Sequence, residues 1–181
     1  MATIDLIVLG MLKRESLSAY ELQKLVEYRN ISKWVKISTP SIYKKVLQLE
    51  QKGFITSRME KDGKMPQKAV YSLTKTGEEE FEKLMMETSC QPIRFFLDFN
   101  AVIVNLESMS EEKQTQCLYN IEENIKIMKS YLEENLVVKE HCEDVPAFGM
   151  AVLQQQYQLA LTIEKWIRSL NTKKEGKKEN E

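Results

Sequence analysis

A chain of 181 residues, 43% of them hydrophobic, is long enough to bury one ordinary core or two small ones, which excludes disorder of the whole chain. Its 26 basic and 27 acidic side chains leave a formal charge of −1, and three widely spaced cysteines fit a reducing compartment better than a disulfide scaffold. Asp5 interrupts the first apolar stretch, and no later stretch has the length of a membrane span. These features predict a cytoplasmic protein without membrane contact.

The charge is divided unequally along the chain. Residues 1–74 carry 13 basic and 7 acidic side chains, whereas residues 75–181 carry 13 and 20. A basic first part favours a surface for a polyanion, and an acidic second part favours a surface that stays away from it. Charge alone leaves a chance segregation of solvated side chains as an open alternative.

The first two predicted elements precede residue 30. Residues 4–12 are densely apolar and predict a buried element, most simply a helix, in which Gly10 allows a close approach. Ser18 and Glu21 have the spacing of a capping box, in which each side chain satisfies a backbone N–H of the first turn. A second helix is therefore expected to begin after Ser18.

A third helix is predicted from Thr39 and Pro40, a capping residue and a favoured first helical residue, to a stop at Gly53. Its core side is expected to hold Ile42, Val46, Leu47 and Leu49. Side chains on its other sides can reach base edges in a major groove or grip phosphates, and the candidates are Thr39, Ser41, Tyr43, Lys44, Lys45 and Gln48. The structural alternative is an ordinary solvated helix face.

Two strands are predicted over residues 54–58 and 69–73, joined by a turn that contains Asp62-Gly63. A helix, a glycine stop and a strand hairpin follow one another in this order in a winged helix-turn-helix. The lysines of the turn, Lys61, Lys64 and Lys68, are expected to hold phosphate or enter the minor groove, with an ordinary charged hairpin as the alternative. Thr74 is expected to cap the next helix.

Two long amphipathic helices are predicted after Ser110 and Pro146. Their apolar stripes are expected to form a dimer interface through Leu118, Ile121, Ile125, Met128, Leu132, Val152, Leu159, Ile163 and Trp166. A homodimer would place two recognition helices on half-sites about 34 to 36 Å apart in an inverted-repeat operator of double-stranded DNA. An intramolecular helical hairpin is the alternative cover for these stripes.

Catalytic chemistry finds little support. His141, Cys142 and Glu143 are adjacent, but adjacent helical residues point in different directions and no second ligand pair has the spacing of a zinc site. No Gly-rich phosphate loop followed by Lys-Ser/Thr is present. We therefore expect no enzyme activity, no metal and no cofactor.

Five segments, taken in order, carry a resemblance to a known family. They are Leu9-Gly10-Met11-Leu12, Ala19-Tyr20-Glu21-Leu22, Ser41-Ile42-Tyr43 with Leu49-Glu50-Gln51-Lys52-Gly53, and Val70-Tyr71-Ser72-Leu73-Thr74-Lys75-Thr76-Gly77. Over about residues 4–80 the chain resembles the PadR family of bacterial winged-helix transcriptional regulators, and its second half resembles the helical dimerisation region of the longer members. It departs from the family pattern at Ala19, where Gly is usual, and at Lys44, where Pro often follows the tyrosine.

The resemblance implies that Tyr43 and its polar neighbours lie at the DNA surface and that Tyr20 contacts the DNA backbone, with a core role as the alternative for either tyrosine. It implies a repressor, and it allows a small aromatic or apolar effector near Phe95, Phe96 and Phe99, for which simple packing is the alternative. The predicted protein is mainly α with a small β-hairpin wing. We expect a DNA-binding domain over residues 1–80, a helical dimerisation domain over 81–170 and a disordered tail over 171–181. The rival hypothesis is a protein-interaction module without specific DNA binding.

Overall fold

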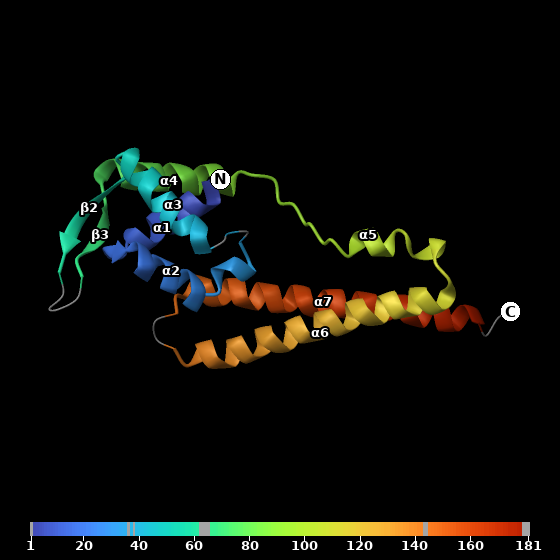
Figure 1. The fold of residues 1–181 in the computed structure, drawn as a ribbon. Helices are drawn as coiled ribbons and strands as arrows, with labels where there is room; N and C mark the ends of the chain where they lie inside the picture. Colours follow the sequence, from blue (N-terminus) through green and yellow to red (C-terminus); the bar gives the residue numbers. More distant parts are fainter. Residues whose placement is uncertain (1, 36, 38, 62–65, 143–144, 179–181) are drawn as a thin grey trace. The chain divides into compact units, whose positions relative to one another are not determined.

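The computed structural model describes residues 2–35, 37, 39–61, 66–142 and 145–178, and the chain forms two compact units, Met1–Arg94 and Phe95–Glu181 (Figure 1). Unit 1 contains α1 (Ala2–Leu12), β1 (Leu17–Ser18), α2 (Ala19–Tyr28), η1 (Ile31–Lys33), α3 (Thr39–Gln51), β2 (Ile55–Glu60), β3 (Lys68–Leu73) and α4 (Lys75–Ser89). Unit 2 contains α5 (Asn100–Ile103), η2 (Leu106–Ser108), α6 (Glu111–Glu140) and α7 (Ala147–Lys178). This mainly helical fold with one small sheet confirms the predicted fold class.

Local capping signals position the helices of unit 1 as the sequence predicts. The backbone N–H of Glu21 donates to Ser18 Oγ at 3.3 Å, and the N–H of Ser18 donates to Glu21 Oε2 at 2.7 Å, which completes the capping box of α2. Thr74 Oγ1 accepts from the N–H of Gly77 at 3.0 Å and caps α4. Gly53 ends α3 with φ +73°, a conformation that suits glycine.

The sheet of unit 1 is antiparallel with strand order β1-β3-β2. Strands β2 and β3 form the predicted wing, with Ile55 opposite Leu73 and Glu60 opposite Lys68. The two-residue strand β1, in which Leu17 pairs with Tyr71, was not predicted, because two residues are too few to show an alternating pattern. This pairing ties the start of α2 to the base of the wing.

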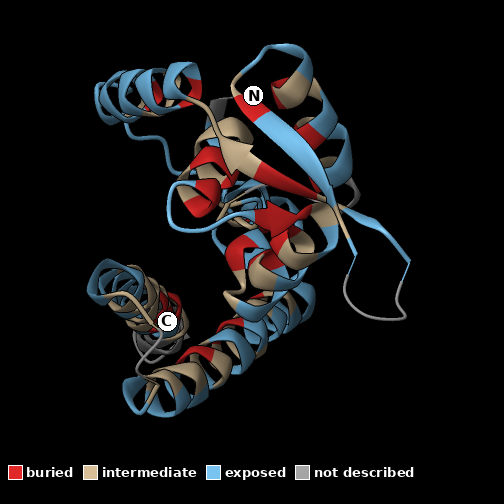
Figure 2. Ribbon diagram, turned by 90° about the vertical axis from the view of Figure 1, so that its left-hand side faces the viewer, coloured by how far each residue is buried: buried red, intermediate tan, exposed pale blue. Residues whose placement is uncertain are grey.

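The core of unit 1 lies between α1, α2, α3 and the sheet (Figure 2). Its fully buried side chains include Leu9, Leu22, Ile42, Leu49 and Ile55. The expectation that Leu47 faces this core is wrong, since its side chain is 55% exposed. The reason is angular: at 100° per residue, Leu47 is turned well away from the direction that Ile42 and Leu49 share.

Helix α4 lies across the boundary expected between residues 80 and 81. It belongs to unit 1 as a whole, where Phe81 is packed against α1 at Gly10 and Leu84 is buried in the core. Helix α7 likewise continues to Lys178, through most of the segment expected to be disordered, which is rich in the good helix formers Lys and Glu. Residues 179–181 lie outside the described residues.

Unit 2 is built on α6 and α7, which lie side by side and antiparallel (Figure 1). Leu118, Ile125 and Leu132 are buried at intervals of seven residues along α6, as are Ala160 and Ile167 along α7. Within this hairpin Glu164 is 5% exposed, and its carboxylate accepts from Lys129 Nζ at 2.7 Å and from Arg168 Nη2 at 2.6 Å. The hydrogen bond from Lys129 is the main reason that the pKa of Glu164 lies below its ordinary value.

Candidate nucleic-acid interface

Helix α3 has one buried face and one outward face. Ile42, Val46 and Leu49, spaced by four and three residues, are at most 1% exposed and anchor the helix in the core. The opposite side presents exposed Lys44, Leu47 and Gln51, with Tyr43 beside them at 44% exposure. An aromatic, a cation, an apolar side chain and an amide thus lie along a single exposed stripe, hereafter the outward stripe (Tyr43, Lys44, Leu47 and Gln51).

The two adjacent lysines of α3 have different environments. Lys44 is exposed on the outward stripe. The Nζ atom of Lys45 instead lies 2.6 Å from Oδ1 of Asp5 in α1, and the two side chains are only 11% and 15% exposed. Lys45 therefore joins α3 to α1, and Lys44 is the lysine available to a ligand on the outward stripe.

The other predicted contacts of α2 and α3 lie around this stripe. Ser41 and Gln48 are half-buried on the flank of α3 that also carries Lys45. Tyr20 is 58% exposed at the start of α2, and the Nζ atom of Lys24 lies 5.5 Å from the centre of its ring. Thr39 begins α3, but its side chain lies outside the described residues.

The wing is connected to α2 by a charged pair. Lys68 Nζ donates to Glu21 Oε1 at 2.7 Å, and this bond, with the contributions of Ser18, lowers the pKa of Glu21 to about 2. Glu21 thus serves both the capping box and the wing. Lys61 is exposed, whereas Lys64 lies outside the described residues.

Sequence reasoning missed Leu47 and Gln51 as members of the outward stripe. A helical wheel centred on Ile42 places both residues on the side away from the core, so the signal was available. It was overlooked because a leucine in an amphipathic helix is ordinarily assigned to the buried face. With Leu47 and Gln51 included, the outward stripe combines apolar and amide side chains with the single cation of Lys44.

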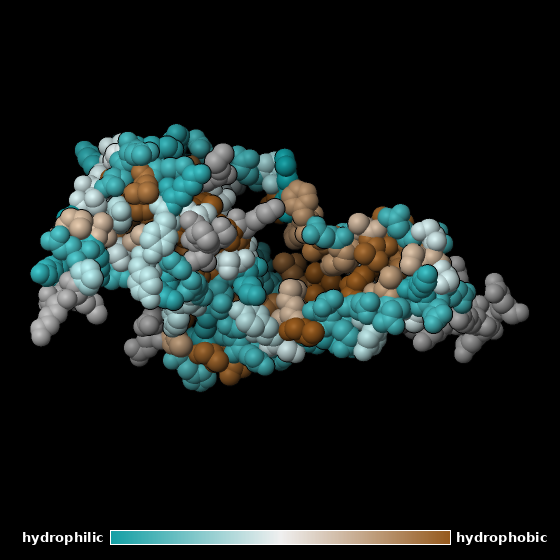
Figure 3. Space-filling view, viewed as in Figure 1, coloured by the Kyte–Doolittle hydropathy of each residue, from teal (hydrophilic) through white to brown (hydrophobic). Residues whose placement is uncertain are grey.

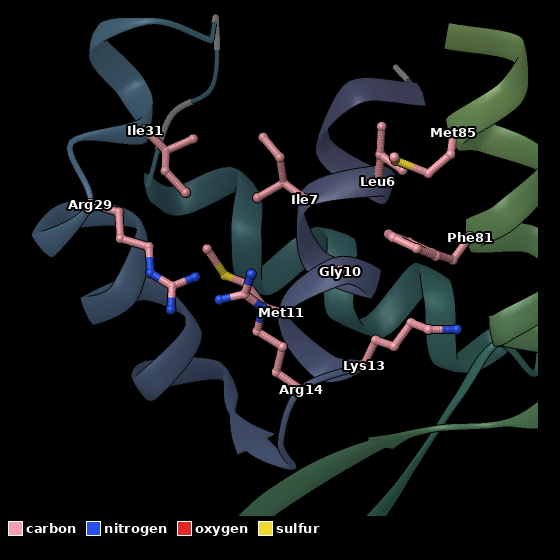
Figure 4. Close-up of a pocket in the computed structure, with 10 residues that line it drawn as sticks. All are labelled: Leu6, Ile7, Gly10, Met11, Lys13, Arg14, Arg29, Ile31, Phe81 and Met85. Carbon is pink, nitrogen blue, oxygen red and sulfur yellow. The ribbon is translucent and has the colours of Figure 1, made fainter. Parts of the chain in front are cut away.

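Unit 1 has a shallow groove of about 370 Å³ (Figure 4). The groove is lined by α1, by the segment that follows α2, and by α4. Arg14 and Arg29 lie at one edge of the groove, and Phe81 and Met85 of α4 lie at the other. Gly10 permits this approach, because a Cβ atom at that position would lie 3.1 Å from Phe81 Cε2. An apolar wall with cations at its rim suits a small apolar molecule that carries an anionic group.

Apolar surface gathers over unit 2 in the region of α5 (Figure 3). The predicted effector residues Phe95 and Phe96 are 70% and 80% exposed, and the ring of Phe99 lies 6.2 Å from that of Trp166. Of the predicted dimerisation residues, Ile125 and Leu132 of α6 are buried in a cluster with Ala160 of α7. Leu118 is also buried, and Ile121, Val152 and Ile163 are half-buried. Met128, Leu159 and Trp166 are 42%, 39% and 38% exposed. The hairpin therefore uses part of the predicted stripes and leaves part on the surface.

Two further findings concern the described residues alone. None of their helices has the length and hydropathy needed to cross a membrane. In the same part of the chain no three His, Cys, Asp or Glu side chains are grouped as a metal ion would require.

A family model described as the transcriptional regulator PadR-like family matches residues 8–83, which cover the outward stripe, the wing and the start of α4. Over residues 8–83 the chain is similar to PadR-like regulators. The matched family is described as one of transcriptional regulators. Among curated proteins, none matches the chain.

Solved structures share the fold of nearly the whole chain, beyond the residues that the family model matches. The structure of Bacillus subtilis PadR in complex with operator DNA has a TM-score of 0.79 and 21% identity, over 93% of this chain and 97% of that one. The same protein in complex with p-coumaric acid has a TM-score of 0.77 and 20% identity, over 92% and 95%. The Vibrio cholerae virulence activator AphA has a TM-score of 0.73 and 16% identity, over 96% and 98%. At these identities the likeness establishes the fold.

Proposed function

We propose that this chain is a homodimeric transcriptional repressor that binds an inverted-repeat DNA operator and is released by a small-molecule effector. The observation that carries the proposal is the outward stripe of α3, in which Tyr43 and Lys44 are exposed within the residues that are similar to PadR-like regulators. A helix fits the major groove, where such side chains reach bases and phosphates. The excess of basic side chains in residues 1–74 suits the same partner.

The proposed DNA contacts differ in role. Lys44 and Tyr43 are proposed to enter the groove, with Ser41, Gln48 and Thr39 beside them. The wing lysines Lys64 and Lys68, together with Tyr20 of α2, are proposed to contact the DNA backbone. Lys45 is proposed to act indirectly, because its pairing with Asp5 holds α3 against α1.

The dimer is proposed to form through unit 2. The α6–α7 hairpin leaves Met128, Leu159 and Trp166 partly exposed, and a second copy would remove them from water. Leu159→Glu should lower the mass measured by light scattering at micromolar concentration from dimer toward monomer. Gln154→Glu, an exposed position turned about 140° away on the same helix, is the matched control and should remain dimeric. A variant dimer as tight as the original would rule out this face.

The proposed effector is a small apolar or aromatic molecule with an anionic group. The groove of unit 1 has the required apolar wall and cationic rim. Phe95 and Phe96 are too exposed to enclose a ligand alone, so an effector site there requires cover by a second copy. Because Bacillus subtilis PadR has been solved with p-coumaric acid, that compound is a suitable first probe. Addition of p-coumaric acid should release the operator from the original protein. If Arg29→Ala stays bound to the operator in its presence, the effector site is the groove of unit 1, and if Phe96→Ala stays bound, the site lies in unit 2.

The sign of regulation needs a separate test, since AphA, which shares this fold, is described as a virulence activator. A reporter placed behind the selected operator decides between repression and activation. Higher expression without the protein indicates a repressor, and lower expression indicates an activator.

The first experiment is the selection of bound sequences from random duplex DNA with the full chain, repeated at two salt concentrations. An enriched inverted repeat, with affinity that falls as salt rises, is the expected result. Absence of enrichment by a folded sample would remove the proposed function and favour a protein-interaction module.

A further inference from the structure

Leu47 is an exposed branched apolar side chain in the middle of an otherwise polar helix face. It is 55% exposed, and its neighbours on the outward stripe are Lys44 one turn before and Gln51 one turn after. The helix does not need a leucine at this position, because Gln or Lys has similar helix propensity and is better hydrated. Exposed leucines are common on protein surfaces, and Leu47 is distinguished by its place on the outward stripe, between Lys44 and Gln51.

The surroundings of Leu47 narrow the choice of ligand. Lys44 and Tyr43 lie on the same stripe, and Lys45, the next cation of α3, is held by Asp5. An apolar surface bordered by a cation matches the major groove at an A·T pair, where the thymine C5-methyl group is the apolar feature beside the phosphate backbone. A purely apolar partner would leave Lys44 without a counter-charge.

We propose that Leu47 reads a thymine methyl group in the major groove, one in each half-site of the operator. This inference rests on the proposed function and assigns part of its sequence preference to one side chain. Residues 44 and 47 are separated by a rise of about 4.5 Å along the helix, and successive bases of one strand by about 3.4 Å. The thymine therefore lies within one or two base pairs of the position that Lys44 contacts.

The test replaces thymine by uracil, which removes the methyl group and leaves the hydrogen-bonding edge of the base unchanged. Each thymine of the selected operator is replaced in turn, at equivalent positions of both half-sites, and the Kd of the full chain is measured for every duplex. One position should show about a fourfold weaker Kd per half-site, the effect of losing one buried methyl-sized group. The other thymines should tolerate the replacement.

The same duplexes are then measured with Leu47→Ala and, as the matched control, Lys44→Ala. Leu47→Ala should bind the thymine and uracil operators equally, whereas Lys44→Ala should bind both more weakly and keep the fourfold ratio per half-site. Because Leu47 is exposed, its replacement is expected to leave the thermal unfolding temperature unchanged.

Three outcomes overturn the inference, and they are distinguishable from failure of the proposed function. An operator bound equally in all its uracil forms removes this role of Leu47 and leaves the regulator intact. Discrimination that persists in Leu47→Ala assigns the methyl contact to another residue. A Leu47→Ala variant with unchanged methyl discrimination and a lower oligomer mass places Leu47 in a protein interface. A chain that selects no sequence removes the function and the inference together.

Discussion

Replacing each of the two adjacent lysines of α3 by alanine should affect a different property: Lys45→Ala should lower stability, and Lys44→Ala should weaken DNA binding. Lys45 Nζ lies 2.6 Å from Asp5 in a pair whose side chains are 11% and 15% exposed. Lys45→Ala leaves that carboxylate largely shielded from water without its cation. Removing one partner of a fully buried pair costs about 3 to 5 kcal/mol, and residual hydration here reduces the expected loss of unfolding free energy to about 2 to 3 kcal/mol.

Lys44→Ala should leave stability unchanged, because Lys44 is exposed and alanine is a good helix former. In a dimer it removes two cations from the DNA interface. The slope of log K against log salt should become shallower by about two, and the affinity should fall on the order of 30-fold if each contact contributes about 1 kcal/mol.

Thermal unfolding and operator titration at several salt concentrations measure the two effects separately. Lys45→Ala should lower Tm on the order of 5 to 10 °C and leave the salt slope of the folded protein unchanged. Combining it with Asp5→Asn should restore more than half of the lost stability, because no unpaired charge then remains. The reasoning is refuted if Lys45→Ala keeps the original Tm and shows the shallower salt slope expected of Lys44→Ala.

Three further predictions follow from contacts within each unit. Gly77→Ala should lower the unfolding free energy by more than about 2 kcal/mol in urea denaturation, since its Cβ would overlap the carbonyl oxygen of Phe54, whereas Gly149→Ala, with ordinary contacts, should be neutral. Glu21→Gln should lower the unfolding free energy by about 1 kcal/mol at pH 7, a figure reduced for the 39% exposure of the Glu21 side chain. Because the pKa of Glu21 is lowered to about 2, this loss of stability is present above pH 4.5 and should vanish as the pH falls toward 2. Glu164→Gln should lower the unfolding free energy by about 1 to 3 kcal/mol at neutral pH. The pKa of Glu164 is depressed because its ionised form is stabilised in the fold, so the difference in stability between variant and original protein should close as the pH falls below 4.5. A difference that stays constant with pH would contradict the role of Glu164 as a buried anion.

The local elements of this protein follow from short-range sequence signals. Ser18 with Glu21, Gly53 and Thr74 mark helix ends through contacts that span three or four residues or through a single backbone conformation, so the sequence determines them without knowledge of the rest of the fold. The order of helix, glycine and hairpin then predicts the winged helix. The apolar stripes of α6 and α7 are predicted in the same way, by spacing alone.

The roles of individual side chains at the proposed interface were decided by the tertiary structure. Lys44 and Lys45 are chemically identical neighbours, and only the packing of α1 against α3 brings Asp5 to one of them across 40 positions of sequence. The exposure of Leu47 likewise depends on which direction of α3 meets the core. Periodicity defines a face of a helix but not its neighbours, because the partners of a side chain come from segments distant in the sequence.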